Sequence, residues 1–475
     1  MSEPPARQPW GVTTPLLAHQ AEAVAKLLPS RVGGLFMEMG TGKTRTAIEL
    51  VRLRQHKIDR VIWFCPVSLK GTVGREIVKH TDCGVGQVYV FDDRTHEDTV
   101  PDGRFWYVVG IESMSLGSRA LHAALRLVDA RSMVIVDEST YIKGQWAKRT
   151  KRITQLSAPA RYRLILTGTP VTQGAVDLYA QMRFLSPKIL GYHSFWSFAA
   201  NHLVYSTRNR GQIVRVLDYP WIIGRIRPYI YQVTKRECLD LPEKIHRDRY
   251  CPLTSEQEAA YARAKEDFVE DVLRFDDEGE LSNGIAIYRL FSRLQAIACG
   301  YRDGAPLVHR RLDLLEDTLA GCDESHVVIW AKYREDVRVI VERIGAGGRR
   351  AFGYDGRVPQ RQREELLDAW RREGGCLVAT LSLGGHGIDL TAAATVIFYA
   401  HGFKYSEHIQ AEDRCHRIGQ KRQVLYIGLW ADCGIEERIE QALHTKGNTL
   451  ARLRHEIDKV KRSGKSKLRA FILAL

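Results

Sequence analysis

The sequence lacks several features that would place it in a simple structural class. Its nine cysteines include no Cys-x-x-Cys pair, so neither a zinc ribbon nor a disulfide framework is indicated. Its longest apolar run, around residues 392–400, is much shorter than the roughly 18 residues that a membrane-spanning helix needs. The opening MSEPPARQPW does not have the basic-then-apolar order of a signal peptide. We therefore expect an intracellular protein in a reducing compartment, with no membrane partner.

Internal repeats and low-complexity linkers are also absent, and acidic residues are in deficit. The chain of 475 residues has 70 lysines and arginines against 56 aspartates and glutamates, which gives a net charge of +14. An excess of this size favours a polyanionic partner, and nucleic acid is the commonest one. The alternative is a basic enzyme whose charge serves only solubility.

Short apolar runs rich in valine and isoleucine recur along the chain, each followed by a turn and a helical stretch. The first series is GGLFMEMGTGKT, RVIWFCPVS, WYVVGIES, SMVIVDES and YRLILTGTP. The second series is HVVIWAKY, RRAFGYDG, CLVATLSLGG, ATVIFYAHG and QVLYIGLWA. Runs of this kind that end in small, polar or acidic residues are typical of buried parallel strands with ligand-binding loops at their ends.

The domain organisation follows from these two series. Residues 177–297 read differently, with helix-like runs and few strand signals. We predict an α/β protein of two lobes, each a parallel sheet flanked by helices, with helical insertions between them. The predicted parts are residues 1–245 with a helical extension from about 175, residues 246–445 with a helical insertion at about 254–300, and a basic helical tail at 446–475.

The stretch MGTGKT follows a predicted strand and precedes a predicted helix. Gly40 and Gly42 would let the loop, including Thr41, bend so that its N–H groups point at phosphate oxygens. Lys43 would neutralise charge on the β- and γ-phosphates, and Thr44 would ligate magnesium. A glycine-rich turn with a chance lysine is the alternative. The order of strand, loop and helix favours a site for ATP and Mg²⁺.

Two further junctions between strand and loop carry polar residues. MVIVDES ends in Asp137 and Glu138. Asp137 would hold the magnesium ion through water, and Glu138 would orient and deprotonate the attacking water. LTGTP offers Thr167 and Thr169, which could couple the phosphates to lobe movement. Either motif alone would be an ordinary solvated turn, but the phosphate loop upstream favours a shared catalytic site.

Late in the chain, AEDRCHRIGQ places two arginines close together. Gln410, Arg414 and Arg417 are spaced i, i+4 and i+7, so we expect them to share one face of a helix. If the two lobes close on ATP, this face would bring two guanidiniums to the γ-phosphate, with Arg417 as the main finger. The alternative is a surface ion pair between Asp413 and Arg417.

The order of these motifs resembles helicase superfamily two, and within it the SWI/SNF-type DNA-translocating ATPases. The resemblance covers about residues 16–443. LLAHQAEAVAKL is similar to the adenine-reading Q motif, with Gln20 as its glutamine. FCPVSLKGTVGREIVK, VVGIES, DESTYIKG and LTGTPVTQGAVDLYAQMRFLSP resemble motifs Ia, Ib, II and III. YDGRVPQRQREELLDAW, TLSLGGHGIDLTAAATVIFY and QAEDRCHRIGQ resemble motifs IV, V and VI, and the last leans toward a small branch that includes annealing helicases and phage-encoded members.

This resemblance implies two RecA-like lobes that bind ATP and Mg²⁺ and translocate along double-stranded DNA, in a chain expected to be a monomer. It implies a location in the cytoplasm or nucleoid of a prokaryotic or phage-infected cell. It places Gln410 at the nucleotide. The loops with Ser68, Ser113, Thr380 and Ser382 would contact nucleic-acid phosphates, although each hydroxyl could equally cap a helix. The basic runs at 148–152, 309–311 and the C-terminal tail would add contacts that do not depend on sequence.

Departures from the family pattern and other functions stay open. Motif V has His386 and Asp389 where leucine and asparagine are usual in the family, and no accessory segment indicates nucleosome remodelling. A strand-separating DNA or RNA helicase is one alternative, and a motor subunit of a nuclease or defence complex is another. A non-catalytic scaffold is disfavoured because the lysine, the two acids and the two arginines are all present.

Overall fold

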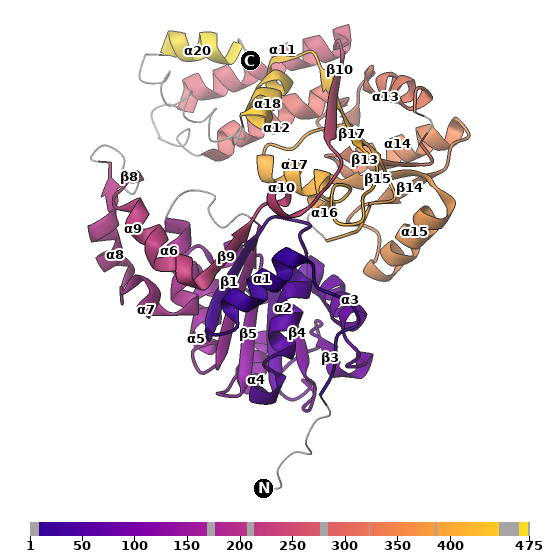
Figure 1. Cartoon of the computed structure of the whole chain (residues 1–475). Coiled ribbons are helices and arrows are strands. Elements are labelled where there is room, and N and C mark those ends of the chain that lie inside the picture. The colour runs from indigo at the N-terminus through magenta and orange to yellow at the C-terminus, as the bar shows by residue number, and fades with distance from the viewer. Residues whose placement is uncertain are drawn as a thin grey trace. The chain divides into compact units, whose positions relative to one another are not determined.

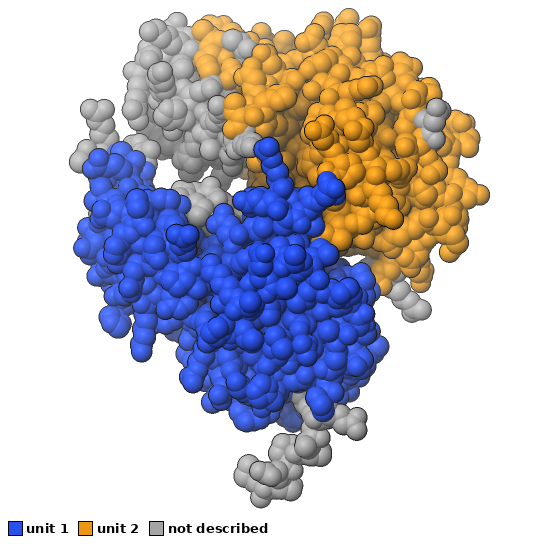
Figure 2. Space-filling view, in the orientation of Figure 1, with its two compact units in different colours: residues 1–240 blue, residues 241–475 orange. Residues whose placement is uncertain are grey.

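A computed structural model describes residues 9–168, 176–206, 213–275, 284–322, 324–384, 387–445 and 465–473. The chain divides into two compact units, residues 1–240 and 241–475 (Figure 2). Thr169, His386 and most of the predicted C-terminal tail lie outside the described residues. Among the residues described, no helix combines the length and the apolar character that a membrane span requires.

A seven-stranded sheet forms the centre of unit 1 (Figure 1). Its strands, in spatial order, are β3 (Val88–Val90), β4 (Trp106–Gly110), β2 (Arg60–Cys65), β5 (Ser132–Asp137), β6 (Tyr162–Thr167), β1 (Val32–Met37) and β9 (Ile230–Val233). Every neighbouring pair is parallel. The interior strands are buried along nearly their whole length, which explains their continuous apolar runs.

Helices cover both faces of this sheet. They are α1 (Ala18–Leu27), α2 (Lys43–Arg52), α3 (Lys70–His80), α4 (Arg119–Leu127), α5 (Lys148–Leu156), α6 (Val176–Leu185), α7 (Pro187–Leu190), α8 (Phe195–His202), α9 (Tyr219–Ile226) and α10 (Lys235–Cys238). Strand residues alternate between two apolar clusters, so that Leu35 packs with α1–α3 and Phe36 packs with α4–α9. A hairpin of β7 (Leu203–Tyr205) and β8 (Ile213–Val216) follows α8. Short 3₁₀ helices are η1 (Gln55–Lys57), η2 (Val67–Leu69), η3 (Val85–Gln87), η4 (Glu112–Met114), η5 (Ser139–Ile142) and η6 (Arg227–Tyr229).

Unit 2 is built around a six-stranded sheet that is also parallel throughout. Its strands, in spatial order, are β10 (Lys244–Cys251), β17 (Val424–Ala431), β16 (Thr395–Phe398), β13 (His326–Ala331), β15 (Gly375–Thr380) and β14 (Ala351–Tyr354). Its helices are α11 (Ser255–Phe275), α12 (Gly284–Ala298), α13 (Arg311–Ala320), α14 (Arg334–Ala346), α15 (Gln360–Glu373), α16 (Leu381–Gly384), α17 (Tyr405–Glu412), α18 (Gly434–His444) and α20 (Lys465–Leu473). A small hairpin joins β11 (Tyr301–Arg302) to β12 (Ala305–Pro306). Residues of α11, α12, α18 and α20 share one apolar cluster beside the sheet.

The predicted fold class is confirmed, and all ten apolar runs form strands. The prediction of a largely helical region from 177 to 297 overlooked four strands. Strands β7 and β8 form the separate hairpin, and β9 and β10 are edge strands of the two large sheets. The sequence KIHRDRYC of β10 is charged because most of its side chains are exposed at the sheet edge, so it has no continuous apolar run. The predicted domain boundaries remain a proposal.

Candidate functional site

The loop between β1 and α2 has the backbone shape of a phosphate cradle. Gly40 and Gly42 have φ values of 78° and 86°, in the left-handed region that favours glycine. Gly42 is also the N-cap of α2, and no side chain caps this helix end. The N–H groups of the first turn of α2 therefore point at the loop, and so does the positive end of the helix dipole. This arrangement suits a phosphate.

Lys43 begins α2, and its side chain turns back toward β1. Its Nζ donates to the carbonyl oxygens of Met37, at 2.9 Å, and Glu38, at 3.3 Å. Gly168, just after β6, lies close to the same loop, because a Cβ atom added there would be 3.6 Å from the Lys43 Nζ and 3.3 Å from the Met39 N atom. The predicted third junction, after Thr167, thus contacts the phosphate loop.

Two side chains of α1 brace the phosphate loop through the carbonyl oxygen of Thr41. The Nε2 of Gln20 donates to it at 3.2 Å, and the Nε2 of His19 lies 2.8 Å away. The other end of the Gln20 amide accepts the N–H of Leu17 at 3.0 Å, and the Thr41 hydroxyl donates to the Glu38 carbonyl at 2.7 Å. Gln20 was predicted to read adenine, and in the structure its amide contacts backbone. Sequence reasoning missed His19, whose only signal was its place beside Gln20.

Asp137 ends strand β5 and is 8% exposed. Burial, and then the neighbouring Glu138 carboxylate, raise the pKa of Asp137 to about 7, while the Lys43 ammonium opposes this shift. The Glu138 N–H donates to the Asp137 Oδ1 at 2.9 Å. Glu138 itself has φ 47°, a left-handed conformation that is strained for glutamate and is often found at functional sites.

The strand order brings these residues to one edge of the sheet. Strand β6 lies between β5 and β1, with Asp137 opposite Leu166 and Phe36 opposite Thr167. The phosphate loop, the Gly168 turn and the acidic pair therefore leave three adjacent strands at their carboxyl ends, where ligands of parallel sheets bind. The left-handed glycines fit a phosphate chain. A buried carboxylate that carries a raised pKa beside a lysine fits a divalent cation, with the half-buried Thr44 in the first turn of α2 as a further oxygen donor.

The loops of Ser68 and Ser113 lie side by side after β2 and β4. The Val67 N–H donates to the Glu112 Oε2 at 2.9 Å. The Ile111 N–H donates to the Cys65 carbonyl at 2.9 Å. The structure thus brings the two predicted phosphate contacts of unit 1 together on adjacent strand ends, and both serines are half-buried.

The basic run at 148–152 lies on α5, and its arginines and lysines face different surroundings. Arg149 donates to the Tyr141 carbonyl at 2.8 Å and Arg152 to the Met114 carbonyl at 2.9 Å, so both arginines serve the fold. Lys148 and Lys151 are exposed. The Lys151 ammonium lies 5.2 Å from the ring centroid of Trp146, an indole that is 59% exposed.

The expected helical face for Gln410, Arg414 and Arg417 is wrong. Helix α17 ends at Glu412, so only Gln410 lies on it. Beyond it the chain tightens, because the N–H of Arg414 bonds the carbonyl three residues back at 3.3 Å. The side-chain amide of Gln420 donates to the carbonyls of Thr391, Ala393 and Cys415, which folds the segment back on itself.

The two arginines differ in exposure. Arg414 is 8% exposed, and its carbonyl oxygen accepts the Leu390 N–H at 3.1 Å. Arg417 is half-buried. Burial would raise the pKa of Asp389, but the Thr391 N–H and the Arg417 guanidinium help to hold that pKa below its usual value. Arg417 is therefore the more accessible of the pair.

Glu412, two residues before Arg414, is held by three basic side chains. Its Oε2 is 2.7 Å from the Nζ of Lys244, and its Oε1 is 3.0 Å from His246 Nε2 and 3.2 Å from His408 Nε2. Burial would raise the pKa of Glu412, but these hydrogen bonds and charges hold it well below its usual value. Lys244 also lies 3.6 Å from Asp413, so the structure gives Asp413 a charge partner other than Arg417. Sequence reasoning missed the basic residues of β10 because it did not identify that strand.

Two other expectations for unit 2 change. Thr380 is 4% exposed and its hydroxyl lies 3.3 Å from that of Ser382, so Ser382 is the exposed member of the pair. The basic run at 309–311 was expected to contact nucleic acid. This is wrong for Arg311, which is 1% exposed and pairs with the buried Glu436 at 2.5 Å.

Most of the chain matches two known protein domains. The model of the SNF2-related domain matches residues 19–298, and that of the helicase conserved C-terminal domain matches residues 310–419. The chain belongs to the SNF2-related family. It therefore carries the two-part ATPase core of helicase superfamily two, as the sequence motifs predicted.

Individual relatives are more distant. The chain is 26% identical, over 473 residues, to a SWI/SNF-related matrix-associated actin-dependent regulator of chromatin subfamily A-like protein 1 homolog of Caenorhabditis elegans, covering 96% of this chain and 64% of that protein. It is 25% identical, over 484 residues, to TATA-binding protein-associated factor BTAF1 of Arabidopsis thaliana, covering 86% of this chain and 23% of that protein. This SNF2-related chain thus spans less than two thirds of either relative.

A solved structure supports the same fold. The helicase domain of Pyrococcus furiosus Hef matches with a TM-score of 0.55 at 14% identity, over 90% of this chain and 98% of that one. Each of the two parallel sheets of the SNF2-related chain, with its helices, thus forms a RecA-like lobe.

Proposed function

We propose that this SNF2-related chain is an ATP-dependent DNA translocase that hydrolyses ATP when it binds double-stranded DNA. One observation carries the proposal. The glycine-rich loop, Lys43 and the buried carboxylate of Asp137 meet at one edge of the unit 1 sheet, where a phosphate chain and its divalent cation would both find their partners.

Each candidate site residue of unit 1 has a distinct role in this proposal. The N–H groups at Gly40–Thr44 bind phosphate oxygens, and Lys43 balances their charge. Thr44 and Asp137 hold Mg²⁺, which when bound offsets the negative charge of the phosphates. Glu138 orients the attacking water and accepts its proton. Gln20 and His19 keep the loop in shape through Thr41.

Arg414 and Arg417 of unit 2 complete the site by stabilising charge on the transferred phosphoryl group, with Gln410 beside them at the nucleotide. Arginine suits this task because its guanidinium is planar, permanently charged and able to donate two parallel hydrogen bonds. Arg417 is the main finger, since it is the more accessible of the two. Because the arginines and the phosphate loop belong to different units, hydrolysis depends on a conformation that brings the units together on ATP.

DNA binding draws on the charge of the chain and on the loops after β2 and β4. The net charge of +14 favours a polyanion, and the exposed Lys148 and Lys151 offer contacts to phosphates. Ser68, Ser113 and Ser382 would add hydroxyl contacts to the backbone. The choice of double-stranded DNA rests on the family, and we propose that the chain works on it as a monomer inside a prokaryotic or phage-infected cell.

The test is an ATP hydrolysis assay with single-stranded DNA, duplex DNA, forked DNA and RNA as stimulators. We expect duplex DNA to stimulate turnover, and K43A and E138Q to abolish it. Robust ATP turnover in either variant would contradict the assignment of Lys43 and Glu138 to the ATPase site. Displacement of a third strand from a triplex without separation of a plain duplex would support translocation, and separation of the plain duplex would show a helicase instead.

A further inference from the structure

A cavity of about 460 Å³ in unit 2 is lined by residues of β10, β17, α17 and α18 and of the segment after β16. Four of the sixteen histidines of the chain line it: His246, His401, His408 and His444. A neutral imidazole is the commonest protein ligand for a transition metal. The proposed ATPase chemistry uses none of these four rings.

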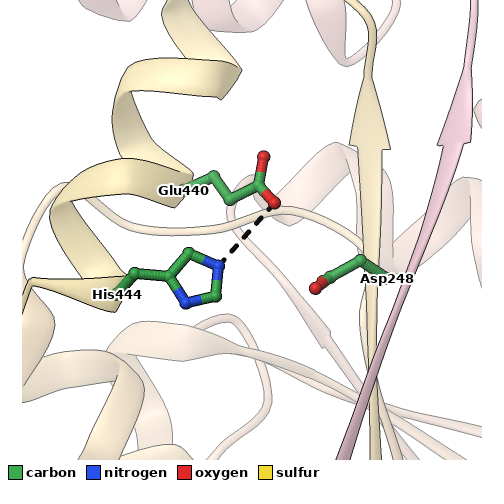
Figure 3. A group of neighbouring side chains, drawn as sticks. All are labelled: Asp248, Glu440 and His444. Carbon is green, nitrogen blue, oxygen red and sulfur yellow. Dashed lines mark ion pairs between the residues drawn. The ribbon is translucent and has the colours of Figure 1, made fainter.

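Three potential ligands converge at this cavity: Asp248, Glu440 and His444 (Figure 3). One ligand atom from each lies within 4.8 Å of the other two. Asp248 is on β10, while Glu440 and His444 are four residues apart on α18 and so share one helix face. Figure 3 shows the three side chains turned toward the space between them.

Neighbouring residues orient both carboxylates. The indole N–H of Trp430 donates to the Asp248 Oδ1 at 2.7 Å, and the Tyr250 hydroxyl donates to the Glu440 Oε1 at 2.7 Å. Carboxylates that ligate metals are usually held by such outer partners.

The backbone opposite Asp248 makes room for this arrangement. Asp248 pairs in register with Gly428 of β17. A Cβ atom at position 428 would lie 2.4 Å from the Asp248 Oδ1 and 2.7 Å from the Trp430 Nε1, which are distances that atoms cannot tolerate. Glycine at this position therefore permits the hydrogen bond that orients the Asp248 carboxylate.

An independent observation at His401 points to a ligand in the same cavity. This ring is 2% exposed, and neither of its nitrogens has a hydrogen-bond partner among the described residues. It stacks on Trp430 with ring centroids 3.7 Å apart and planes 2° apart. A buried imidazole without a partner is costly, and a ligand in the cavity would supply that partner.

We propose that this cavity binds a divalent transition-metal ion of the Zn²⁺ class through Asp248, Glu440 and His444, with His401 as a further nitrogen donor in the cavity. Mixed carboxylate and imidazole ligands favour zinc over magnesium and calcium, which prefer oxygen alone. The ion would tie α18 to the edge strand β10. That strand also carries Lys244, which holds Glu412 of the predicted motif VI.

The test is calorimetric titration of the tag-free full-length chain with Zn²⁺, in millimolar Mg²⁺ and without nucleotide. We expect one site per chain, with the affinity reduced about ten-fold or more in D248N, E440Q and H444Q. Zn²⁺ should raise the melting temperature of the parent chain and not that of these variants. The side chain of His444 is 69% exposed, so H444Q is expected to fold normally.

The pair Glu76 and His80 on α3 gives a matched control. It has the same four-residue spacing, but its ring nitrogens are 2.7 Å from the Thr14 hydroxyl and 2.9 Å from Glu76. H80Q should bind Zn²⁺ as the parent does. Absence of a site in the parent chain, parent-like affinity in all three ligand variants, or equal affinity for Ca²⁺ would overturn the proposal. H401F keeps a ring on Trp430 and removes both nitrogens, and unchanged affinity in it would contradict the assignment of His401.

Discussion

Gln20 donates its side-chain N–H to the carbonyl oxygen of Thr41, 3.2 Å away, and accepts the Leu17 N–H at the other end of the same amide. We predict that Q20A loosens the phosphate loop and weakens ATP binding about ten-fold, the equivalent of one or two lost hydrogen bonds. Because the amide contacts backbone, binding of GTP should weaken by the same factor. Titration of both nucleotides with the variant measures this ratio.

Gln55 provides the matched control for Q20A. Its amide also makes two bonds to backbone, to the N–H and the carbonyl of Trp10, both at 3.0 Å. Q55A should leave nucleotide affinity unchanged. Loss of ATP affinity with GTP affinity preserved in Q20A would show that Gln20 reads adenine, as the Q-motif resemblance implies.

The buried Asp137 gives a prediction about pH. Burial raises its pKa in the folded protein to about 7, well above the unfolded value of about 3.9. The folded state therefore binds more protons than the unfolded state between these values, and stability falls as pH rises through this window. We expect D137N to be more stable than the parent by about 1–3 kcal/mol at pH 8, with no difference near pH 4.

Thermal melts of D137N and the parent chain between pH 4 and pH 8, without nucleotide or metal, measure this difference. The gain should appear above pH 4 and be complete above pH 7. A variant that is less stable than the parent at pH 8 would show that the Asp137 carboxylate has a stabilising partner. A gain that does not change with pH would assign the effect to packing.

The buried ion pair of Arg311 and Glu436 predicts a large loss of stability in unit 2. Arg311 also donates to the carbonyls of Tyr399, at 2.7 Å, and Leu429, at 3.0 Å, so it joins α13 to α18 and to the sheet. E436Q would leave a buried charge without compensation and should cost about 3–5 kcal/mol. Urea denaturation monitored by tryptophan fluorescence measures the change.

Arg338 offers a contrast to Arg311. It pairs with Glu335 and Glu342 on the surface of α14, where water screens the charges. R338A should shift the urea midpoint little, if at all. Equal losses in E436Q and R338A would contradict the energetic distinction between the buried and exposed pairs.

Much of this fold can be predicted from the pattern of apolar residues in the sequence. Where the pattern fails, there is a physical reason. The interior strands are buried on both faces, so their apolar runs identify them. Strand β10 is charged because it lies at a sheet edge, and nothing local marks it as a strand. The phosphate loop could be predicted because left-handed glycines and a helix start are local features. The contacts of Gln20 with Thr41 and of Lys244 with Glu412 depend on chain folding and could not be predicted.

The predicted helix face for Arg414 and Arg417 was wrong because spacing in the sequence does not show where a helix ends. A period of i, i+4, i+7 predicts one face only while the helix continues. Here α17 ends at Glu412, whose carboxylate is held by Lys244 and His246 of β10 and by His408 one turn earlier on the helix. The local spacing therefore does not place the arginines on one helix face.

Lys148 and Lys151 give a test of DNA binding. Both are exposed on α5, while Arg149 and Arg152 of the same run are held by backbone carbonyls. If both lysines contact phosphates, K148E/K151E should weaken binding to all duplex sequences and lower the slope of log affinity against log salt by about 2. Fluorescence anisotropy with duplex DNA at several salt concentrations measures both effects.

The control for this variant is K57E, which reverses an exposed lysine of η1. It should change the salt dependence much less than the double variant. An unchanged salt slope in K148E/K151E would remove α5 from the DNA-binding surface. A loss confined to particular DNA sequences would contradict contact with phosphates alone.

The most direct test of the central claim is single-turnover ATP hydrolysis by R417A on saturating duplex DNA, beside equilibrium ATP binding. We expect hydrolysis to fall about a thousand-fold while ATP affinity changes little, because in the proposed mechanism Arg417 acts on charge that develops in the transition state. R422A removes an exposed arginine paired with Glu324 and should behave as the parent. Near-normal hydrolysis in R417A, or a collapse of ATP affinity with turnover preserved, would contradict the claim that unit 2 supplies the arginine that completes the ATPase site.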